Sequence, residues 1–268
     1  MYRQKYIYSD KFSIMTENYN DEWWRDKSFW EDFAPLMFDN ERLDSAREET
    51  EGIIRLSGAQ APQKILDVGC GPGRHALQFA LRGYKVTGVD IQESYLADAR
   101  KKTEQLSEPP VFINCDMRTF QSEEQFDGAV SLFQSLGYFE NTEEDLAVCR
   151  NVFNSLKPGG WFLLEMDGKE ALAGNFEERN WFERSGKLIL LEYAVEGAWD
   201  RLWNHWRYRD EKGRWYECNF SYRLYSAVEL GMLLEQAGFS SVEFFGSFSG
   251  RPYDHTAEKL VALARKLT

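Results

Sequence analysis

The chain has 268 residues, of which 43% are hydrophobic and 15% aromatic. This length suits one large α/β domain with an insertion, or two modest domains. No uninterrupted apolar run approaches the roughly 18 residues that a membrane-spanning helix needs. The formal net charge of -12 repels phosphate backbones. We therefore expect neither a membrane nor a nucleic acid among the partners of this protein.

The sequence offers no metal centre and no export signal. The four cysteines lie far apart without a CxxC spacing, which argues against a disulfide framework and against a zinc cage. The three histidines also lack a metal-ligand spacing. Residues 1–10 are polar and lack the apolar centre of a secretory signal. We expect a cytoplasmic protein without a bound metal.

Two helices are predicted near the N-terminus, at residues 28–37 and 41–56, and Gly58 suits the end of the second. Together they predict an N-terminal helical cap over residues 1–58. The cap carries three tryptophans, Trp23, Trp24 and Trp30.

Residues 64–166 alternate short β-rich runs with helical segments, which predicts a parallel sheet with helices on its faces in a core domain that spans residues 59–167. Thr142 and Asp145 resemble a capping box at the start of the last helix, with Asp in place of Glu or Gln. The expected strands are residues 64–68, 84–89, 111–114, 126–132 and 161–166, and the expected helices are residues 74–81, 94–105 and 142–156.

Residues 168–225 break this pattern, because aromatic and charged residues alternate there as in antiparallel strands with one solvent-exposed face. We expect an antiparallel β insertion without a helix, acting as a substrate lid. Its strands are predicted at residues 187–195, 201–209 and 215–224, with turns at Gly197 and Gly213.

The core resumes over residues 226–268. Ser226 and Glu229 predict a capped helix that ends at Gly238, followed by strands at residues 242–245 and 259–264. The fold class is thus α/β, with a seven-stranded, mostly parallel sheet that carries helices on both faces. The β insertion and the N-terminal helices are additions to it.

A glycine-rich turn lies directly between the first predicted strand and its helix. Gly69, Gly71 and Gly73 let the backbone pass close to a ligand, and the helix N-terminus beyond offers free N–H donors. The turn indicates a nucleoside-like ligand, although glycine turns also follow strands for structural reasons alone. A dinucleotide fingerprint counted from Gly69 needs a glycine where Arg74 stands, which disfavours a dehydrogenase.

The motif DVGCGPGR, residues 67–74, resembles the first motif of class I S-adenosylmethionine (SAM)-dependent methyltransferases. The resemblance continues in order through GVDI, NCDM, the predicted fourth strand and the KPGG turn, and it implies a Rossmann-like fold with SAM as cofactor. It implies that Asp90 holds the ribose hydroxyls, and that Asp116 and Met117 receive the adenine. It spans residues 62–167 well and 226–268 in outline.

The stretch LFQSLGYF, residues 132–139, is similar to a loop found in a group of bacterial methyltransferases. At the carboxyl end of the fourth strand, Phe133 should contact the cofactor, and Tyr138 either faces the acceptor or only packs. A general base is needed only for a protonated acceptor. His255, in a loop on the ligand side, and His205, in an insertion strand, are candidates for that role, and a core or surface histidine is the alternative for His205.

Tryptophans also crowd the insertion, at Trp181, Trp199, Trp203, Trp206 and Trp215. Aromatic faces suit a sulfonium or a cationic amine, so an aromatic lid is one explanation, and a small local core is the other. The residues expected to bind the cofactor are Asp67, Gly69, Gly71, Gly73, Asp90, Ile91, Asp116, Met117, Phe133 and Trp24.

The sequence as a whole predicts a SAM-dependent methyltransferase that modifies an O or N atom of a small-molecule acceptor. Catalysis then rests largely on aligning the acceptor with the methyl group and on excluding water. An NAD(P)-dependent oxidoreductase and a non-catalytic SAM-binding module are the alternatives. The identity of the acceptor and the oligomeric state stay open.

Overall fold

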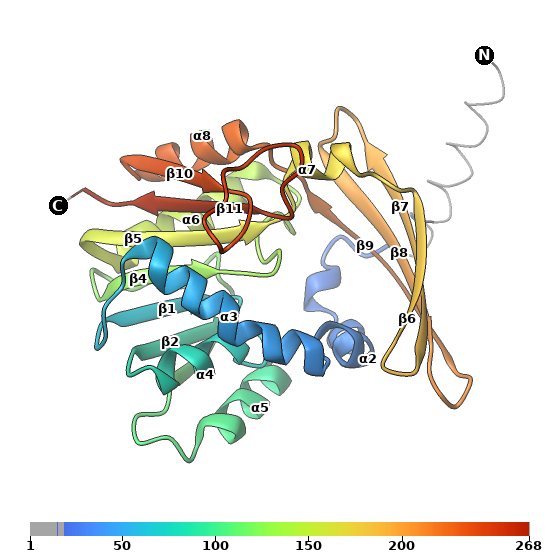
Figure 1. Cartoon of the computed structure of the whole chain (residues 1–268), viewed down its shortest axis with the longest axis horizontal. Helices are drawn as coiled ribbons and strands as arrows, with labels where there is room; N and C mark the ends of the chain where they lie inside the picture. Colours follow the sequence, from blue (N-terminus) through green and yellow to red (C-terminus); the bar gives the residue numbers. More distant parts are fainter. Residues whose placement is uncertain (1–14, 16–18, 268) are drawn as a thin grey trace. The chain divides into compact units, whose positions relative to one another are not determined.

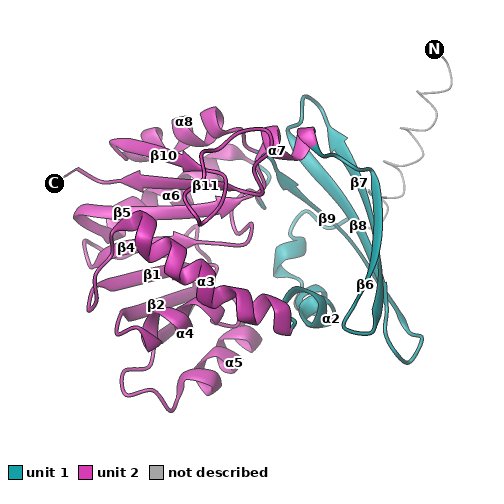
Figure 2. Cartoon of the chain, in the orientation of Figure 1, with its two compact units in different colours: residues 1–39, 138–140, 175–224 teal, residues 40–137, 141–174, 225–268 magenta. Residues whose placement is uncertain are grey.

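The computed structural model describes residue 15 and residues 19–267, so the expectation about residues 1–10 lies outside the described residues. The chain forms two compact units, shown in teal and magenta in Figure 2. Unit 1 comprises Met1–Asp39, Tyr138–Glu140 and Asn175–Leu224. Unit 2 comprises Asn40–Gly137, Asn141–Gly174 and Tyr225–Thr268.

Unit 2 is built on a seven-stranded sheet with the order β10-β11-β5-β4-β1-β2-β3. Strands β1 to β5 pair in parallel, and β11 pairs antiparallel with both β5 and β10. This confirms the expected seven-stranded, mostly parallel sheet. The strands are β1 (Lys64–Val68), β2 (Lys85–Asp90), β3 (Val111–Asn114), β4 (Phe126–Ser131), β5 (Leu156–Met166), β10 (Ser241–Phe245) and β11 (Leu260–Arg265).

Helices cover both faces of this sheet. Figure 1 shows α3, α4 and α5 along one face and α6 and α8 along the other. The central strands are therefore buried on both sides and are almost continuously apolar, as in Leu163, Leu164 and Val261. The helices of the unit are α3 (Asn40–Ser57), α4 (Arg74–Leu81), α5 (Glu93–Thr103), α6 (Thr142–Ser155), the short α7 (Lys169–Gly174) and α8 (Ala227–Ala237).

The strand order reverses between β1 and β4, since the chain runs outward from β1 to β3 and then returns to the other side of β1. In an open parallel sheet, such a reversal leaves room for a ligand at the carboxyl ends of the strands. The turn after β1 and the loop after β4 both leave the sheet at this point.

Unit 1 contains a four-stranded antiparallel sheet, in the order β6-β7-β8-β9, and the helices η1 (Trp23–Arg25) and α2 (Lys27–Met37). Phe29 and Phe33 of α2 pack on Phe220 and Tyr208 of the sheet, with ring centroids 5.4 Å apart in both pairs. The sheet thus buries one face under α2. Its strands are β6 (Arg179–Arg184), β7 (Lys187–Glu196), β8 (Arg201–Arg209) and β9 (Trp215–Arg223).

Most predicted elements are confirmed, and β1, α4 and β3 have the expected bounds. The start of α6 differs: Asn141 is the N-cap, and Glu144 completes the capping box. Asn141 has extended backbone angles, so Thr142 is already helical. The Asp145 carboxylate instead accepts hydrogen bonds from the Gly137 N–H and the Tyr225 hydroxyl.

Strand β5 begins at Leu156 rather than at residue 161, because the Lys157 to Gly160 turn lies inside it. Its register against β4 shifts between Phe126 and Gly128, which is the signature of a bulge. The turn that the sequence predicts therefore interrupts the strand without ending it.

Two elements between β5 and β7 were not predicted. The expectation of no helix within residues 168–225 is wrong, because α7 forms there. Side-chain contacts of its own unit stabilise it: Lys169 pairs with Glu229, and Glu170 accepts a hydrogen bond from the Tyr253 hydroxyl. Strand β6 was missed because it is an edge strand that pairs only with β7 and leaves most of its side chains exposed.

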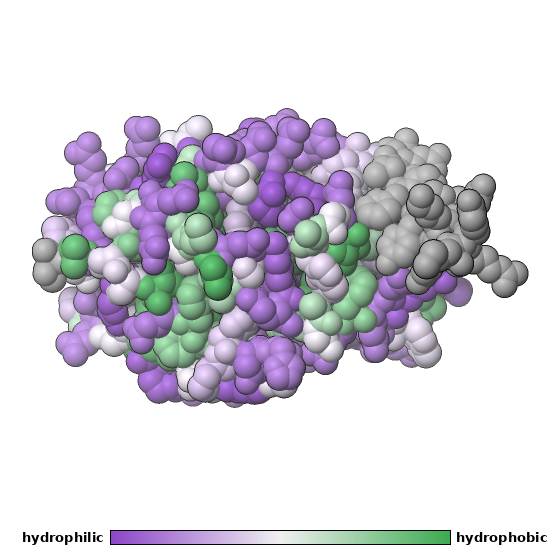
Figure 3. Space-filling view, turned by 90° about the horizontal axis from the view of Figure 1, so that it is seen from above, coloured by the Kyte–Doolittle hydropathy of each residue, from purple (hydrophilic) through white to green (hydrophobic). Residues whose placement is uncertain are grey.

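No helix among the described residues is long and apolar enough to cross a membrane. Hydrophobic residues nevertheless reach the surface, as the green areas of Figure 3 show. On α8, for example, Val228 and Met232 are exposed. Scattered apolar side chains of this kind are ordinary on protein surfaces.

Candidate active site

The glycine-rich turn after β1 needs glycine at the predicted positions. Gly69, Gly71 and Gly73 have φ angles of 71°, 51° and 73°, in the left-handed region that glycine adopts without a steric cost. A Cβ atom on Gly69 would lie 2.8 Å from the Cβ and Oγ atoms of Ser135, and one on Gly73 would lie 2.8 Å from the Cβ of Ala99. The turn therefore lies tightly between the loop after β4 and helix α5.

Asp90, at the end of β2, fixes this turn. Its Oδ2 accepts a hydrogen bond from the Gly71 N–H at 2.8 Å, and its Oδ1 accepts one from the Gln92 N–H at 2.8 Å. Burial raises the pKa of the Asp90 carboxyl, although these N–H donors favour the charged form. A carboxylate has about four lone-pair positions, so Asp90 can still accept bonds from a ligand hydroxyl. The next residue, Ile91, accepts a hydrogen bond from Asn114 through its carbonyl.

Asp67 is a buried carboxyl at the end of β1. Burial raises its pKa to about 7, and the charge of Arg74 partly opposes this shift. Within the described part of the chain, its Oδ2 is a buried atom without a hydrogen-bond partner. Such an oxygen fits a ligand that brings a donor, for example the ammonium group of an amino acid. The turn, Asp67 and Asp90 therefore suit SAM, which carries both an amino-acid end and a ribose.

Asp116 and Met117 follow β3, as the sequence predicts, but the Asp116 carboxylate already has a protein partner. The Arg118 side chain donates to it at 2.7 Å, and the Arg118 backbone N–H does so at 2.9 Å. Arg118 also pairs with Glu144. The carbonyl of Met117 accepts a hydrogen bond from Asn151 at 3.2 Å. This arrangement holds the segment after β3 in place, and its role toward adenine stays a prediction.

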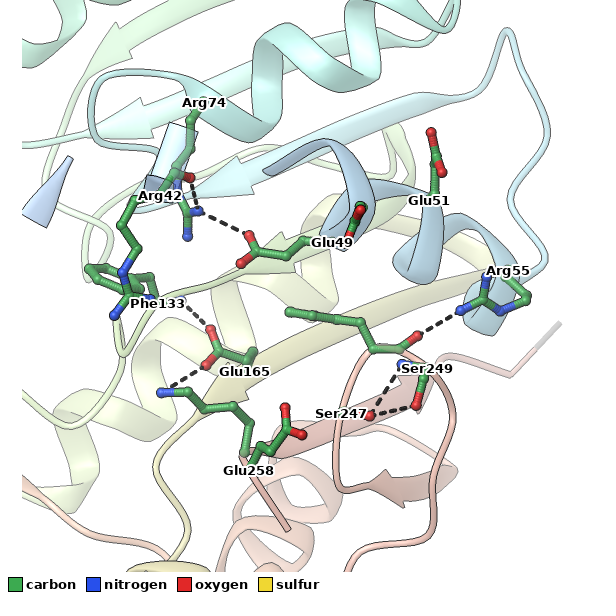
Figure 4. Close-up of a pocket in the computed structure, with 13 residues that line it drawn as sticks. Arg42, Glu49, Glu51, Arg55, Arg74, Phe133, Glu165, Ser247, Ser249 and Glu258 are labelled. Carbon is green, nitrogen blue, oxygen red and sulfur yellow. Dashed lines mark hydrogen bonds and ion pairs between the residues drawn. The ribbon is translucent and has the colours of Figure 1, made fainter. Parts of the chain in front are cut away.

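The loop after β4 carries Phe133 in an unusual backbone conformation. Phe133 and Gln134 have φ angles of 61° and 56°, in the left-handed region that is costly for residues with a Cβ atom. The guanidinium groups of Arg42 and Arg74 lie 4.8 Å and 5.2 Å from the centre of the Phe133 ring. The Phe133 N–H donates to Oε2 of Glu165 at 2.6 Å (Figure 4).

A cavity of about 560 Å³ in unit 2 begins at this loop (Figure 4). It lies against α3, the carboxyl ends of β4 and β5, and the loop between β10 and β11. Five glutamates and four basic residues line it, so the lining carries both signs of charge. The charged residues are Glu48, Glu49, Glu51, Glu165, Glu258, Arg42, Arg55, Arg74 and Lys259.

Glu49 organises one wall of the cavity. Its Oε2 lies 2.6 Å from Nε2 of His75 and 3.0 Å from the Arg74 guanidinium. Burial opposes ionisation of Glu49, but His75 and Arg74 outweigh it and hold the pKa of the carboxyl at about 2. Burial and the Arg74 charge lower the pKa of His75 to about 4. His75 is therefore a buried histidine that is neutral near pH 7 and contacts a residue of the wall.

The three candidate catalytic residues do not gather in one unit. His255 is an exposed loop residue of unit 2. Tyr138 and His205 belong to unit 1, where the Tyr138 ring packs on Trp23 and Nε2 of His205 lies 2.8 Å from Glu217. The pairing of His205 with Asn219 places its side chain on the sheet face opposite to that of Phe220.

Trp24, the remaining cofactor candidate, is also part of unit 1. Its ring is buried against Phe139 and lies 4.4 Å from the Arg25 guanidinium. Trp203 packs on Tyr19 in the same unit. For these two tryptophans, packing within unit 1 is therefore what the structure describes, and a role toward the cofactor stays a prediction.

Several residues of the site were missed by sequence reasoning, namely Arg42, Glu49, Glu165 and Lys259. Only Glu165 carried a visible signal, because it is the one charged residue in the apolar run WFLLEM of β5. A charged residue in a strand covered on both faces requires a partner or a function. The others lie on α3 and on a loop, where charged residues are common.

The geometry defines a Rossmann-like α/β protein with a glycine turn and two buried carboxyl groups at the switch point of its sheet. Residues 65–160 match the family model described as "Methyltransferase domain". The dTDP-3-amino-3,4,6-trideoxy-alpha-D-glucopyranose N,N-dimethyltransferase of Streptomyces venezuelae is 29% identical over 217 residues, which cover 78% of this chain and 86% of that protein.

Solved structures show the same fold. The CcbJ methyltransferase from Streptomyces caelestis superposes with a TM-score of 0.73 at 21% identity, and SAM-bound CalS10, an amino pentose methyltransferase from Micromonospora echinaspora, with 0.63 at 24%. Each alignment covers 83% of this chain and 90% of the other. The chain therefore contains a methyltransferase domain at residues 65–160, and over most of its length it is similar to methyltransferases that act on small molecules.

Proposed function

We propose that this enzyme transfers the methyl group of SAM to the amino nitrogen of a small-molecule acceptor. The assignment of SAM as the cofactor rests on the hydrogen bond from the Gly71 N–H to Asp90, because this bond joins the glycine turn to a carboxylate suited to ribose hydroxyls. The choice of nitrogen rests on the amino-sugar N,N-dimethyltransferase that matches most of the chain.

The residues of unit 2 suit this reaction. SAM supplies a methyl group on a positively charged sulfur, so the protein mainly binds, orients and excludes water. Asp67 and Asp90 bring carboxylates to the turn, and Phe133 lines the cavity. We assign the acceptor to this cavity, because its volume of about 560 Å³ is that of a small-molecule site.

The charge of the cavity favours an amine. Glu49 stays ionised, since its pKa is held at about 2, and Glu165 and Glu258 add further carboxylates. Carboxylates attract an ammonium group. The ammonium group must then lose a proton, to a carboxylate or to solvent, so that its nitrogen lone pair can take the methyl group while S-adenosylhomocysteine leaves. The basic residues of the same lining suit an acceptor that also carries an anionic group.

The test incubates the purified enzyme with SAM and matched pairs of small molecules, one with a primary amine and one with a hydroxyl in its place. Mass spectrometry follows methyl gain on the acceptor together with release of S-adenosylhomocysteine (SAH). We expect the amines to gain one or two methyl groups. If the hydroxyl partners are methylated and the amines are not, oxygen is the acceptor atom and the proposal is wrong.

A further inference from the structure

Glu165 makes contacts in the site that methyl transfer by itself does not explain. It lies near the end of β5, is 5% exposed, and accepts the Phe133 N–H at 2.6 Å. Its other carboxylate oxygen lies 3.5 Å from Nζ of Lys259, which also pairs with Asp167 at 2.9 Å. A buried carboxylate with a backbone N–H and an ammonium group as partners is held in one orientation.

The loop that Glu165 holds is strained. Phe133 and Gln134 both adopt left-handed angles, a conformation that persists only where surrounding contacts impose it. The Gln134 side chain adds two such contacts, as it accepts the Asp167 N–H at 2.8 Å and donates to the Leu136 carbonyl at 3.0 Å. Glu165 provides the charged contact at the first strained residue.

This loop also lies against the cofactor turn. Ser135 approaches Gly69 so closely that a Cβ atom there would lie 2.8 Å from it. On the other side, the Phe133 ring lies under the guanidinium groups of Arg42 and Arg74. The backbone conformation at residues 133–135 therefore sets the position of two groups that border the proposed SAM site.

We propose that Glu165 is a positioning residue for the cofactor: by accepting the Phe133 N–H, it holds the loop after β4 in the left-handed conformation that shapes the SAM site. Lys259 keeps the carboxylate oriented toward that N–H. Glu165 thus acts through Phe133. The proposal rests on SAM binding at the glycine turn, as proposed above.

The test compares two variants that remove the same charge and have similar size. Glu165→Gln keeps an oxygen that accepts the Phe133 N–H, whereas Glu165→Met has none. SAH is titrated calorimetrically into each full-length variant, and thermal unfolding reports whether each one is folded. We expect Glu165→Gln to bind SAH within a factor of about three of the parent and Glu165→Met to bind about tenfold more weakly, as expected for one lost charge-assisted bond.

A second comparison separates positioning from simple destabilisation. Glycine adopts left-handed angles without a steric cost, so a Phe133→Gly background removes the steric strain that the contact from Glu165 offsets at this residue. There, Glu165→Met should weaken SAH binding by less than about twofold, which a double-mutant cycle measures as coupling. If Glu165→Met does not fold, Glu165→Ala takes its place in both comparisons.

The outcomes are distinct. A folded Glu165→Met protein that binds SAH like the parent overturns the inference. The inference is also wrong if Glu165→Gln loses as much SAH affinity as Glu165→Met, or if Glu165→Met loses as much affinity in the Phe133→Gly background as in the parent. A parent protein that does not bind SAH at all instead removes the proposed function on which the inference rests.

Discussion

At the residue scale, the site depends on a few backbone contacts between loops that leave neighbouring strands. Asp90 holds Gly71, Glu165 holds Phe133, and Ser135 fills the space that Gly69 leaves open. Each contact joins a residue with a restricted or strained backbone to a side chain from another strand. Single substitutions at these positions should therefore change ligand binding more than they change the fold.

Asp90→Ala should weaken SAH binding by about 1.5 to 3 kcal/mol, because it removes the carboxylate that holds the glycine turn and is proposed to hold the ribose. Isothermal titration calorimetry measures the effect. The matched control is Asp127→Ala, which removes an aspartate at the opposite end of the sheet, where it binds Lys157 and the Lys64 N–H. Equal SAH affinities of the Asp90→Ala variant and the parent would show that Asp90 has been misassigned.

The buried His75 should make stability depend on pH. Its pKa is lowered from 6.5 to about 4 in the folded protein, so between these values the unfolded chain binds a proton that the folded chain does not. The contribution of the neutral His75 to the free energy of unfolding is therefore fully present above pH 6.5 and is lost as the pH falls toward 4. Asp67, whose pKa is raised to about 7, contributes with the opposite sign, because the folded protein binds its proton first.

The difference between the parent and His75→Gln cancels the contribution of Asp67, and the Gln amide can still donate a hydrogen bond to Glu49. Urea unfolding at a series of pH values should show the advantage of the parent over the variant falling by about 2 kcal/mol between pH 6.5 and 4. A difference that stays constant over this range would mean that His75 is protonated in the folded protein.

At the scale of elements, α8 shows how a local sequence signal fixes a helix boundary. Ser226 accepts the Glu229 N–H at 3.2 Å, while the Glu229 carboxylate accepts the Ser226 N–H at 2.8 Å. Gly238 ends the helix with a φ of 117°. Both ends are set by residues of the helix itself, so the sequence predicts them correctly.

Ser226→Ala should lower the free energy of unfolding by about 1 kcal/mol, the usual cost of a lost N-cap. The position is distant in sequence from the glycine turn, and we expect the SAH affinity to remain that of the parent. Chemical denaturation measures the stability, and Ser226→Thr, which keeps the capping hydroxyl, should restore most of it. An unchanged unfolding midpoint in Ser226→Ala would contradict the role of the cap.

The elements that the sequence did not predict share a cause. Helix α7 has only six residues and depends on contacts from Glu229 and Tyr253, and β6 depends on β7 for its pairing. At α6, the sequence pattern placed the capping box one residue too late, at Thr142 and Asp145, whereas Asn141 and Glu144 form it. Local patterns identify elements that carry their own boundaries, whereas α7 and β6 depend on contacts with other elements.

For the whole molecule, the same distinction separates the two units. The seven-stranded sheet and its glycine turn follow from alternating strand and helix signals, so the sequence predicts unit 2 well. Unit 1 is assembled from three separate segments, and its core joins Phe29 and Phe33 of α2 to rings of the insertion. The sequence suggests such long-range pairing through clustered aromatic residues but does not specify the partners.

We propose that the insertion is a lid for the acceptor, because the chain leaves unit 2 after β4 and again after β5, where the ligand edge of the sheet lies. The test replaces residues 176–222 by a glycine-serine linker and adds Phe29→Ser and Phe33→Ser, which make the newly exposed face of α2 polar. This variant should retain SAH binding and lose methyl transfer. Calorimetry and SAH release measure the two properties.

A control that replaces only the turn at residues 210–214 with glycine and serine should keep both properties. Loss of SAH binding in the deletion variant, while the rest of the protein stays folded, would show that the cofactor needs unit 1. Unchanged methyl transfer would show that the insertion is not a lid.

The central claim is that the turn at Gly69 to Gly73 binds SAM. The most direct measurement is a pair of calorimetric titrations of the purified protein, one with SAH and one with NAD. The account predicts binding of SAH on the micromolar scale and no heat from NAD. No heat from SAH, together with saturable binding of NAD, would contradict it and would make the protein a dinucleotide-binding enzyme instead.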